Sequence, residues 1–140
     1  MNCADPSPTE IEASLDQLGL LSAVANLEKG LDTRLTEATL AGFSTELKRG
    51  ISVARSLARR SSVLLLSEPS SDLGLDTRAK LKKWIASQHG QRTIMIATAD
   101  RSFLTLADRF VFLDAGRVVV NDTGDAGLKK IIAAMENAGR

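Results

Sequence analysis

The sequence predicts an α/β fold in which parallel strands are joined by helical crossovers. Two short apolar runs, Val63–Leu66 and Thr93–Ala97, are each bounded by polar residues, as in strands buried on both faces. Between them, Arg78–Ser87 has the apolar spacing of a helix, and the following His89-Gly90 ends it. Strand, helix and strand in this order favour a right-handed crossover and a parallel sheet.

A β-hairpin and a helix are expected after the second strand. Two further strands, Arg109–Leu113 and Arg117–Val120, are separated by Asp114-Ala115-Gly116, a sequence typical of a tight turn. A short helix is expected at about 102–107, before the hairpin. A last helix is expected at about 125–137, with apolar residues on one face.

The first 60 residues are predicted to be mainly helical. Apolar residues recur at three- and four-residue steps from Ile11 to Val24, and Gly19 is expected to divide this stretch into two helices. Gly30–Arg34 is typical of a turn, and residues 35–43 have no clear period. From Ser44 the helical period returns, with Ser44 placed to cap a new helix.

Composition indicates one domain of ordinary globular type. The chain has 140 residues, 44% hydrophobic and 25% charged, and its net charge of +1 argues against a nucleic-acid partner. The single cysteine, Cys3, cannot form an internal disulfide and suits a reducing compartment. No apolar run approaches the roughly 20 residues of a membrane span, and the N-terminus lacks the order of a signal peptide. We therefore expect a cytoplasmic chain.

The order of these elements resembles the ATP-binding domains of ATP-binding-cassette (ABC) transporters. AGFSTELKRGISVARSLARRSSVLLLSEP is similar to that family's signature LSGGQ, basic helix and Walker B strand, and ADRFVFLDAGRVVV is similar to its terminal hairpin. The earlier GLDTRL resembles the segment before the signature in exporters and type I secretion ATPases. The resemblance covers about residues 10–133. It implies ATP and Mg²⁺ as ligands, with a second ABC domain and a transmembrane subunit as partners.

The signature position departs from the family pattern. Ser44 is kept, but Thr45 and Glu46 stand where two glycines let backbone N–H groups approach the γ-phosphate bound by the opposite subunit. Glu46 also brings a negative charge toward a polyanion. Two unit charges about 4 Å apart interact by about 4 kcal/mol at an intermediate dielectric, here repulsively. The alternative is an ordinary helix N-terminus with an acidic residue in its first turn.

The Walker B position keeps only one of its two acids. Ser67 stands where the family's aspartate assists Mg²⁺, and a neutral hydroxyl is a weaker ligand for this hard cation. Glu68 stands where the family's general base polarises the attacking water, so the resemblance implies a catalytic role for it if the chain is active. Without the resemblance, Glu68 is a solvated strand end.

Two further positions also lack the family's side chains. An ungapped count from Glu68 places Ala99 at the switch histidine and Gly74 at the D-loop aspartate, unless a shift of the turn brings Asp72 or Asp76 there. Alanine offers no side-chain donor to a γ-phosphate. The one histidine, His89, is expected at an exposed helix end, and no metal-binding set of residues is predicted.

The sequence contains no Gly-x-x-x-x-Gly-Lys-Ser/Thr phosphate-binding loop. The resemblance is therefore to the C-terminal half of a P-loop ABC ATPase domain. We expect a flexible segment at 1–10, a helical subdomain with the degenerate signature at 11–60, and an α/β subdomain with the Walker B-like strand and the hairpin at 61–140.

Three functions fit this pattern. The first is a degenerate, exporter-like cassette fragment that cannot hydrolyse ATP alone and lies in the cytoplasm, peripheral to the inner face of the membrane. The second is an active ATPase that couples hydrolysis to export once a P-loop-containing partner completes it. The third is a non-catalytic interaction or regulatory module, or an inactive remnant. The bare strand edges also predict self-association.

Overall fold

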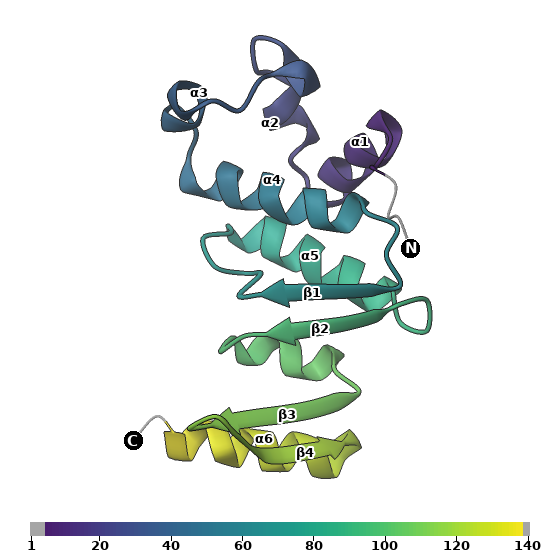
Figure 1. Ribbon diagram of the computed structural model, residues 1–140, viewed down its shortest axis with the longest axis vertical. Helices are drawn as coiled ribbons and strands as arrows, with labels where there is room; N and C mark the ends of the chain where they lie inside the picture. The colour runs from purple at the N-terminus through teal and green to yellow at the C-terminus, as the bar shows by residue number, and fades with distance from the viewer. Residues whose placement is uncertain (1–4, 139–140) are drawn as a thin grey trace. The chain divides into compact units, whose positions relative to one another are not determined.

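The computed structural model describes residues 5–138, and the chain divides into two compact units, Met1–Asp100 and Arg101–Arg140. In order, the first unit contains α1 (Pro8–Gln17), α2 (Leu21–Ala25), a 3₁₀ helix η1 (Gly30–Asp32), α3 (Glu37–Ala41), α4 (Thr45–Ala58), β1 (Val63–Ser67), α5 (Leu75–Ser87) and β2 (Thr93–Ala97). The second contains η2 (Arg101–Leu106), β3 (Arg109–Asp114), β4 (Arg117–Thr123) and α6 (Gly124–Ala138). Figure 1 shows these elements. The predicted subdomain boundary after residue 60 stays a prediction.

The N-terminal helices follow local capping signals. Ser7 and Glu10 form a capping box, and Pro8 occupies the first turn, so α1 begins before Ile11, the first apolar residue of the periodic stretch. Residues 1–4 of the segment expected to be flexible lie outside the described residues. Gly19, with a φ of 72°, divides α1 from α2 as predicted.

α4 is the central helix of the first unit and contacts α1. The Ser44 hydroxyl accepts a hydrogen bond from the Leu47 amide and caps α4, as the sequence predicts. Gly50 allows close packing, because a Cβ there would lie 2.3 Å from Leu20 Cδ1. The core between these helices is aliphatic and includes Leu15, Leu18, Leu20, Val53 and Leu57.

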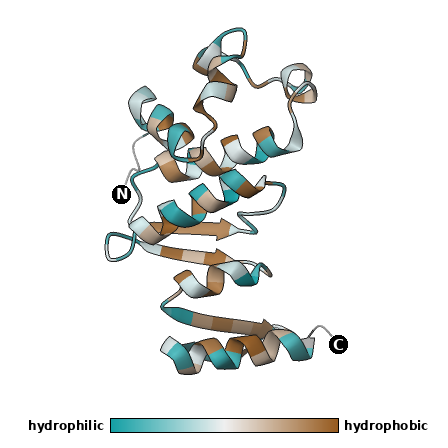
Figure 2. Cartoon of the chain, turned by 180° about the vertical axis from the view of Figure 1, so that it is seen from behind, coloured by the Kyte–Doolittle hydropathy of each residue, from teal (hydrophilic) through white to brown (hydrophobic). Residues whose placement is uncertain are grey.

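The parallel sheet is confirmed, but its predicted burial on both faces is wrong. β1 and β2 pair in parallel, with Leu65 opposite Met95. α5 lies over one face of this pair (Figures 1 and 2), where Leu64 and Leu66 are buried. On the other face Leu65 is 68% exposed and Met95 is 64% exposed. The described helices of this unit cover only one face, so side chains alternate between buried and exposed.

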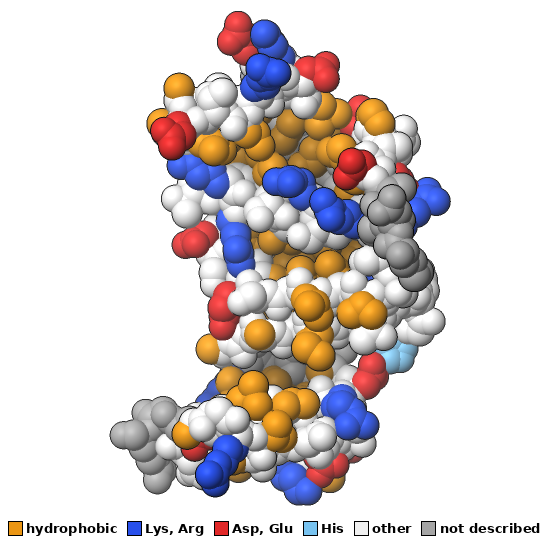
Figure 3. Space-filling model, viewed as in Figure 1, with side chains coloured by type: hydrophobic (Ala, Val, Ile, Leu, Met, Phe, Trp, Pro, Cys, Tyr) orange, Lys and Arg blue, Asp and Glu red, His pale blue; other side chains and the backbone are white. Residues whose placement is uncertain are grey.

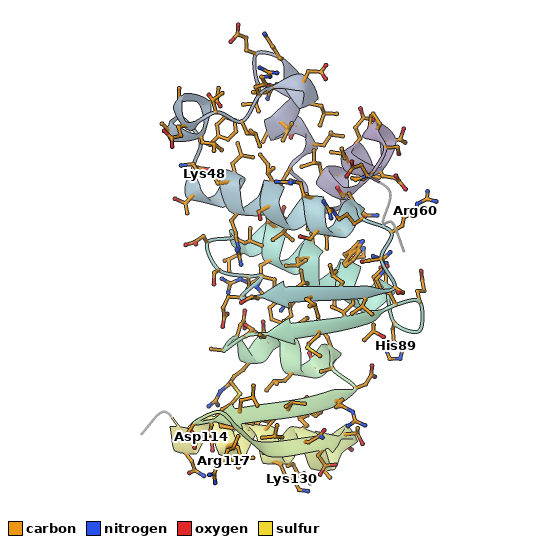
Figure 4. The ribbon with its side chains drawn as sticks, viewed as in Figure 1. Lys48, Arg60, His89, Asp114, Arg117 and Lys130 are labelled. Atoms are coloured by element: carbon orange, nitrogen blue, oxygen red, sulfur yellow. The ribbon has the colours of Figure 1, made fainter. Side chains whose placement is uncertain are left out.

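The second unit is a hairpin covered by a helix. β3 and β4 pair antiparallel, with a bulge between Phe112 and Leu113. The predicted turn is confirmed, with positive φ angles at Ala115 and Gly116 (45° and 77°). α6 contacts both strands, and Phe110 and Ile131 are buried there. In Figure 4, Asp114 and Arg117 flank the turn and Lys130 lies on α6.

Apolar side chains also remain exposed on the hairpin. They are Val111, Leu113, Val118 and Val119. Figure 3 shows apolar side chains over both pairs of strands and also over the N-terminal helices. Each unit therefore has a covered face and an uncovered apolar face.

Three elements differ from the sequence prediction. Glu37–Ala41 is a short helix that periodicity missed, because Thr36 and Thr39 cap it reciprocally within five residues. α5 begins at Leu75 and not Arg78, and the expected helix at 102–107 is a 3₁₀ helix. Among the described residues, none of the helices is both long and apolar enough to cross a membrane.

Candidate functional site

The candidate site lies where β1 and β2 end. Glu68 directly follows β1, and its amide donates to the carbonyl of Ala97, 2.8 Å away. Its φ of 42° is unusual for a residue with a Cβ, and such strained backbone commonly marks functional positions. Parallel strands place their carboxyl ends at one edge, so Glu68 and the residues after Ala97 become neighbours.

Both oxygens of the Glu68 carboxylate accept hydrogen bonds from the chain that follows β2. The Thr98 hydroxyl donates to Oε2 at 2.8 Å, and the Ala99 amide donates to Oε1 at 2.9 Å. Thr98 Oγ1 in turn accepts from the Asp100 amide at 3.0 Å. The structure thus brings together Glu68 and Ala99, which are 31 residues apart in sequence. Glu68 is fixed in one orientation by the turn after β2.

Arg49 is a site residue that the sequence reasoning missed. Its Nη2 atom donates to the carbonyl oxygens of Ser67 and Glu68, at 2.8 and 2.5 Å. Helical periodicity shows only that Arg49 lies outside the apolar face of α4. It gives no signal for two carbonyl acceptors that lie 18 and 19 residues further along the chain. Arg49 ties α4 to the end of β1 and supports the strained Glu68 backbone.

A second polar cluster adjoins this turn. The Ser70 hydroxyl donates to Asp100 Oδ2 at 2.9 Å, and Arg78 Nη1 lies 3.8 Å from the same oxygen. Arg78 Nη2 also donates to the Ser70 carbonyl at 3.3 Å. These contacts hold the turn between β1 and α5 against the turn after β2. Sequence reasoning identified none of the three residues as part of the site.

The signature-position and D-loop-position residues also meet. The amide of Gly74 donates to Glu46 Oε1 at 2.9 Å. Of the two alternatives for the D-loop acid, Asp76 pairs with Lys80 on its own helix at 2.6 Å, and Asp72 is exposed with a φ of 61°. Which residue corresponds to the family's D-loop aspartate stays a prediction.

Ser44 and Thr45 lie at the start of α4, where Ser44 acts as its cap. Ser67 is exposed at the end of β1. His89 is exposed in the turn after α5 (Figure 4). The side chains and amides that donate to the Glu68 carboxylate are those of Thr98 and Ala99, and His89 is not among them.

Two features of the described residues weaken their fit to a magnesium nucleotide. Ser67 offers a hydroxyl where a carboxylate would be the stronger ligand, and both Glu68 oxygens already accept hydrogen bonds. Across the described part of the chain, no group of three or more His, Cys, Asp or Glu side chains converges as a metal site. The contacts that the described residues make here are hydrogen bonds that anchor the turn.

Comparisons with known proteins support one kind of domain. No protein-family model matches the chain. It is 28% identical over 118 residues to an ATP-dependent lipid A-core flippase of Alkalilimnicola ehrlichii, covering 84% of this chain and 20% of the flippase. It is 32% identical over 117 residues to the thiamine import ATP-binding protein ThiQ of Rhizobium meliloti, covering 75% of this chain and 49% of ThiQ. These similarities support an ABC-ATPase-like domain.

The fold of this ABC-ATPase-like domain matches a solved structure. A bacterial Atm1-family ABC exporter with ATP bound aligns with a TM-score of 0.78 and 23% identity, covering 96% of this chain and 24% of the exporter. The mixed α/β fold is therefore confirmed. The chain spans no more than about half the length of these curated relatives, from 20% of the flippase to 49% of ThiQ.

Proposed function

We propose that this chain corresponds to the C-terminal half of the ATP-binding-cassette domain of an exporter-like ABC transporter, and that it does not hydrolyse ATP by itself. The similarity to ATP-binding proteins of transporters supports the first part. The absence of hydrolysis is inferred from the hydrogen bonds that the Glu68 carboxylate already accepts. Its two oxygens bind Thr98 and Ala99, next to a serine in place of the expected acid.

The physical reason is the loss of several phosphate contacts together. A fixed electrostatic contact in a transition state is commonly worth about 100-fold or more in rate. By resemblance, Ser67, Ala99 and Glu46 each replace one such contact. The 140 residues also contain no phosphate-binding loop of the Walker A type. The retained scaffold then serves as a non-catalytic partner, which packs on a second ABC domain and on a transmembrane subunit at the cytoplasmic face.

Nucleotide binding tests this proposal directly. A fluorescent ATP analogue is titrated into the 140-residue chain with and without Mg²⁺, and ATP turnover is measured on the wild type and on Glu68→Gln. We expect no saturable micromolar binding and no turnover that depends on Glu68. Saturable micromolar binding by the chain alone, or a turnover that falls at least about tenfold in Glu68→Gln, would overturn it.

A second candidate is favoured by one observation. Glu68, the position of the family's general base, is intact, so an active site completed in trans by a P-loop-containing partner is chemically conceivable. This candidate is tested by repeating the titration after adding a separately expressed P-loop-containing cassette half. Turnover that appears only in the mixture and is abolished by Glu68→Gln favours the second candidate, and its absence favours the first.

A further inference from the structure

Glu46 and Gly74 form a contact between two helices that neither local sequence predicts. Glu46 lies in the first turn of α4, and its Oε1 accepts the Gly74 amide at 2.9 Å. The Thr77 hydroxyl, on a buried residue in the first turn of α5, lies 3.4 Å from the same oxygen. One carboxylate of α4 therefore faces the N-terminus of α5.

The start of α5 has no side-chain cap of its own. Gly74 is its N-cap residue and carries no side-chain oxygen to accept the free amides of the first turn. A carboxylate near a helix N-terminus is stabilised by these amides and by the helix dipole. Glu46 accepts the amide of the N-cap residue itself from 28 residues upstream, which is the contact that the N3 Glu or Gln makes in a local capping box.

Gly74 makes room for the carboxylate. Its φ and ψ are −63° and 162°, a conformation that any residue adopts, so the backbone does not require glycine here. The contact with Glu46 does require it, because an added Cβ would displace this flexible side chain. A Cβ at position 74 would lie 2.4 Å from Glu46 Oε1 and 3.1 Å from Glu46 Cδ. The two residues are therefore a matched pair, since Glu46 provides the cap and Gly74 provides the space.

We propose that Glu46 and Gly74 form an interhelical latch in which the Glu46 carboxylate is the resident anion at the N-terminus of α5. The latch stands on geometry alone. Its meaning for the domain rests on the proposed function. Glu46 at the signature position and Gly74 at the D-loop position bind each other, so no site for an exchangeable anion is left between them. A family-like aspartate at position 74 would place a second carboxylate against Glu46.

A double-mutant cycle tests the latch. Urea unfolding is measured for the wild type, Glu46→Ala, Gly74→Ala and the double variant. Loss of a cap typically costs about 1 kcal/mol, and 1.4 kcal/mol is tenfold, so we expect Gly74→Ala to lower the folding equilibrium constant about five-fold in the wild type. In the Glu46→Ala background we expect the same change to cost clearly less, because the clash with the carboxylate is gone and only the ordinary preference of an N-cap for glycine over alanine remains. Equal effects in both backgrounds would overturn the proposal.

Gly42→Ala is the matched control. Gly42 also has a negative φ (−80°), but a Cβ there would meet nothing closer than the Thr39 carbonyl oxygen at 3.6 Å. We expect it to have the same effect with and without Glu46. If the stability change caused by Gly42→Ala depended on Glu46, the cycle would be reporting a change in the whole domain and not the contact at Gly74. That result would count against the latch.

A second readout remains if a variant fails to fold. In Glu46→Gln the acceptor is uncharged, so the hydrogen bond from the Gly74 amide weakens. We expect an upfield shift of the Gly74 amide proton and faster hydrogen exchange at that amide. An unchanged shift and exchange rate would contradict the latch. None of these measurements involves nucleotide, so failure of the latch and failure of the proposed function are distinguishable.

Discussion

The backbone amide of Ala99 donates a hydrogen bond to Glu68 Oε1 at 2.9 Å. By resemblance, these are the positions of the family's switch histidine and its general base. Alanine has no side-chain donor, and here the main chain makes the contact instead. The Thr98 hydroxyl occupies the other carboxylate oxygen at 2.8 Å. In the described structure Glu68 therefore acts as an anchor between the ends of two strands.

We first predict that Glu68 matters for stability. Glu68→Ala removes both of these hydrogen bonds to a charged group. Bonds of this kind contribute about 1.5–3 kcal/mol net of water, and the contact with the exposed Ala99 contributes less. We expect a loss of about 1–3 kcal/mol in the free energy of unfolding, and a smaller loss in Glu68→Gln, which keeps one oxygen acceptor. Urea unfolding measures both. An unchanged urea midpoint in Glu68→Ala would show that the anchor contributes nothing.

The second prediction concerns Arg49, which donates to the carbonyls of Ser67 and Glu68. Arg49→Ala leaves both carbonyls without this donor and should lower the free energy of unfolding by about 1–3 kcal/mol. Arg55, an exposed arginine of the same helix, is the control, and Arg55→Ala should change it by no more than about 0.5 kcal/mol. Chemical denaturation compares the two, and equal effects would contradict a specific role for Arg49.

The third prediction concerns the uncovered face of β1 and β2. Leu65 and Met95 lie opposite each other there and are both largely exposed. A parallel sheet is usually covered on both faces, and exposed apolar patches promote association. We expect the wild-type chain to self-associate, and Leu65→Lys with Met95→Lys to shift it toward monomer. Light scattering after size exclusion measures the mass.

The control for this prediction is on the opposite face of the same strand. Leu64 is buried, so Leu64→Ala should cost about 2–5 kcal/mol of stability and should not reduce association. The lysine variants, in contrast, should keep the wild-type urea midpoint. A wild-type chain that is monomeric at high concentration would contradict the predicted self-association.

The fourth prediction is an acid sensitivity at the N-terminus of α1. The Ser7 amide and hydroxyl hydrogen-bond to Glu10, and Arg60 forms an ion pair with it, and together these lower the pKa of Glu10. Because the folded pKa is below the unfolded one, this contribution to stability is complete at neutral pH. It is lost in acid, as the pH falls through the lowered pKa.

Glu10→Gln should therefore lower the melting temperature at about pH 7 and have little effect at an acidic pH below the lowered pKa of Glu10. Circular dichroism at the two pH values measures the difference. Glu12→Gln, on the exposed side of the same helix, is the control, and its effect on the melting temperature should be the same at both pH values. A Glu10→Gln effect of the same size in acid would exclude a role for the charge.

The sequence by itself determined the local elements. Periodicity and capping residues are local signals, so the helix capped by Ser44, the break at Gly19, the strand Thr93–Ala97 and the turn at Ala115–Gly116 all follow from a few neighbouring residues. The order of motifs also pointed to the ABC-ATPase-like fold. Short helices such as Glu37–Ala41 escaped because five residues give too few turns to show a period.

Only the tertiary structure decided how the candidate site is held. The contacts of Glu68 with Ala99, of Arg49 with Ser67, and of Glu46 with Gly74 join residues 31, 18 and 28 positions apart. Such pairs depend on how helices and strands pack, and no local pattern encodes which amide a carboxylate will meet. The same holds for the open face of β1 and β2, since an apolar run shows that a strand prefers burial and says nothing about which of its faces is covered.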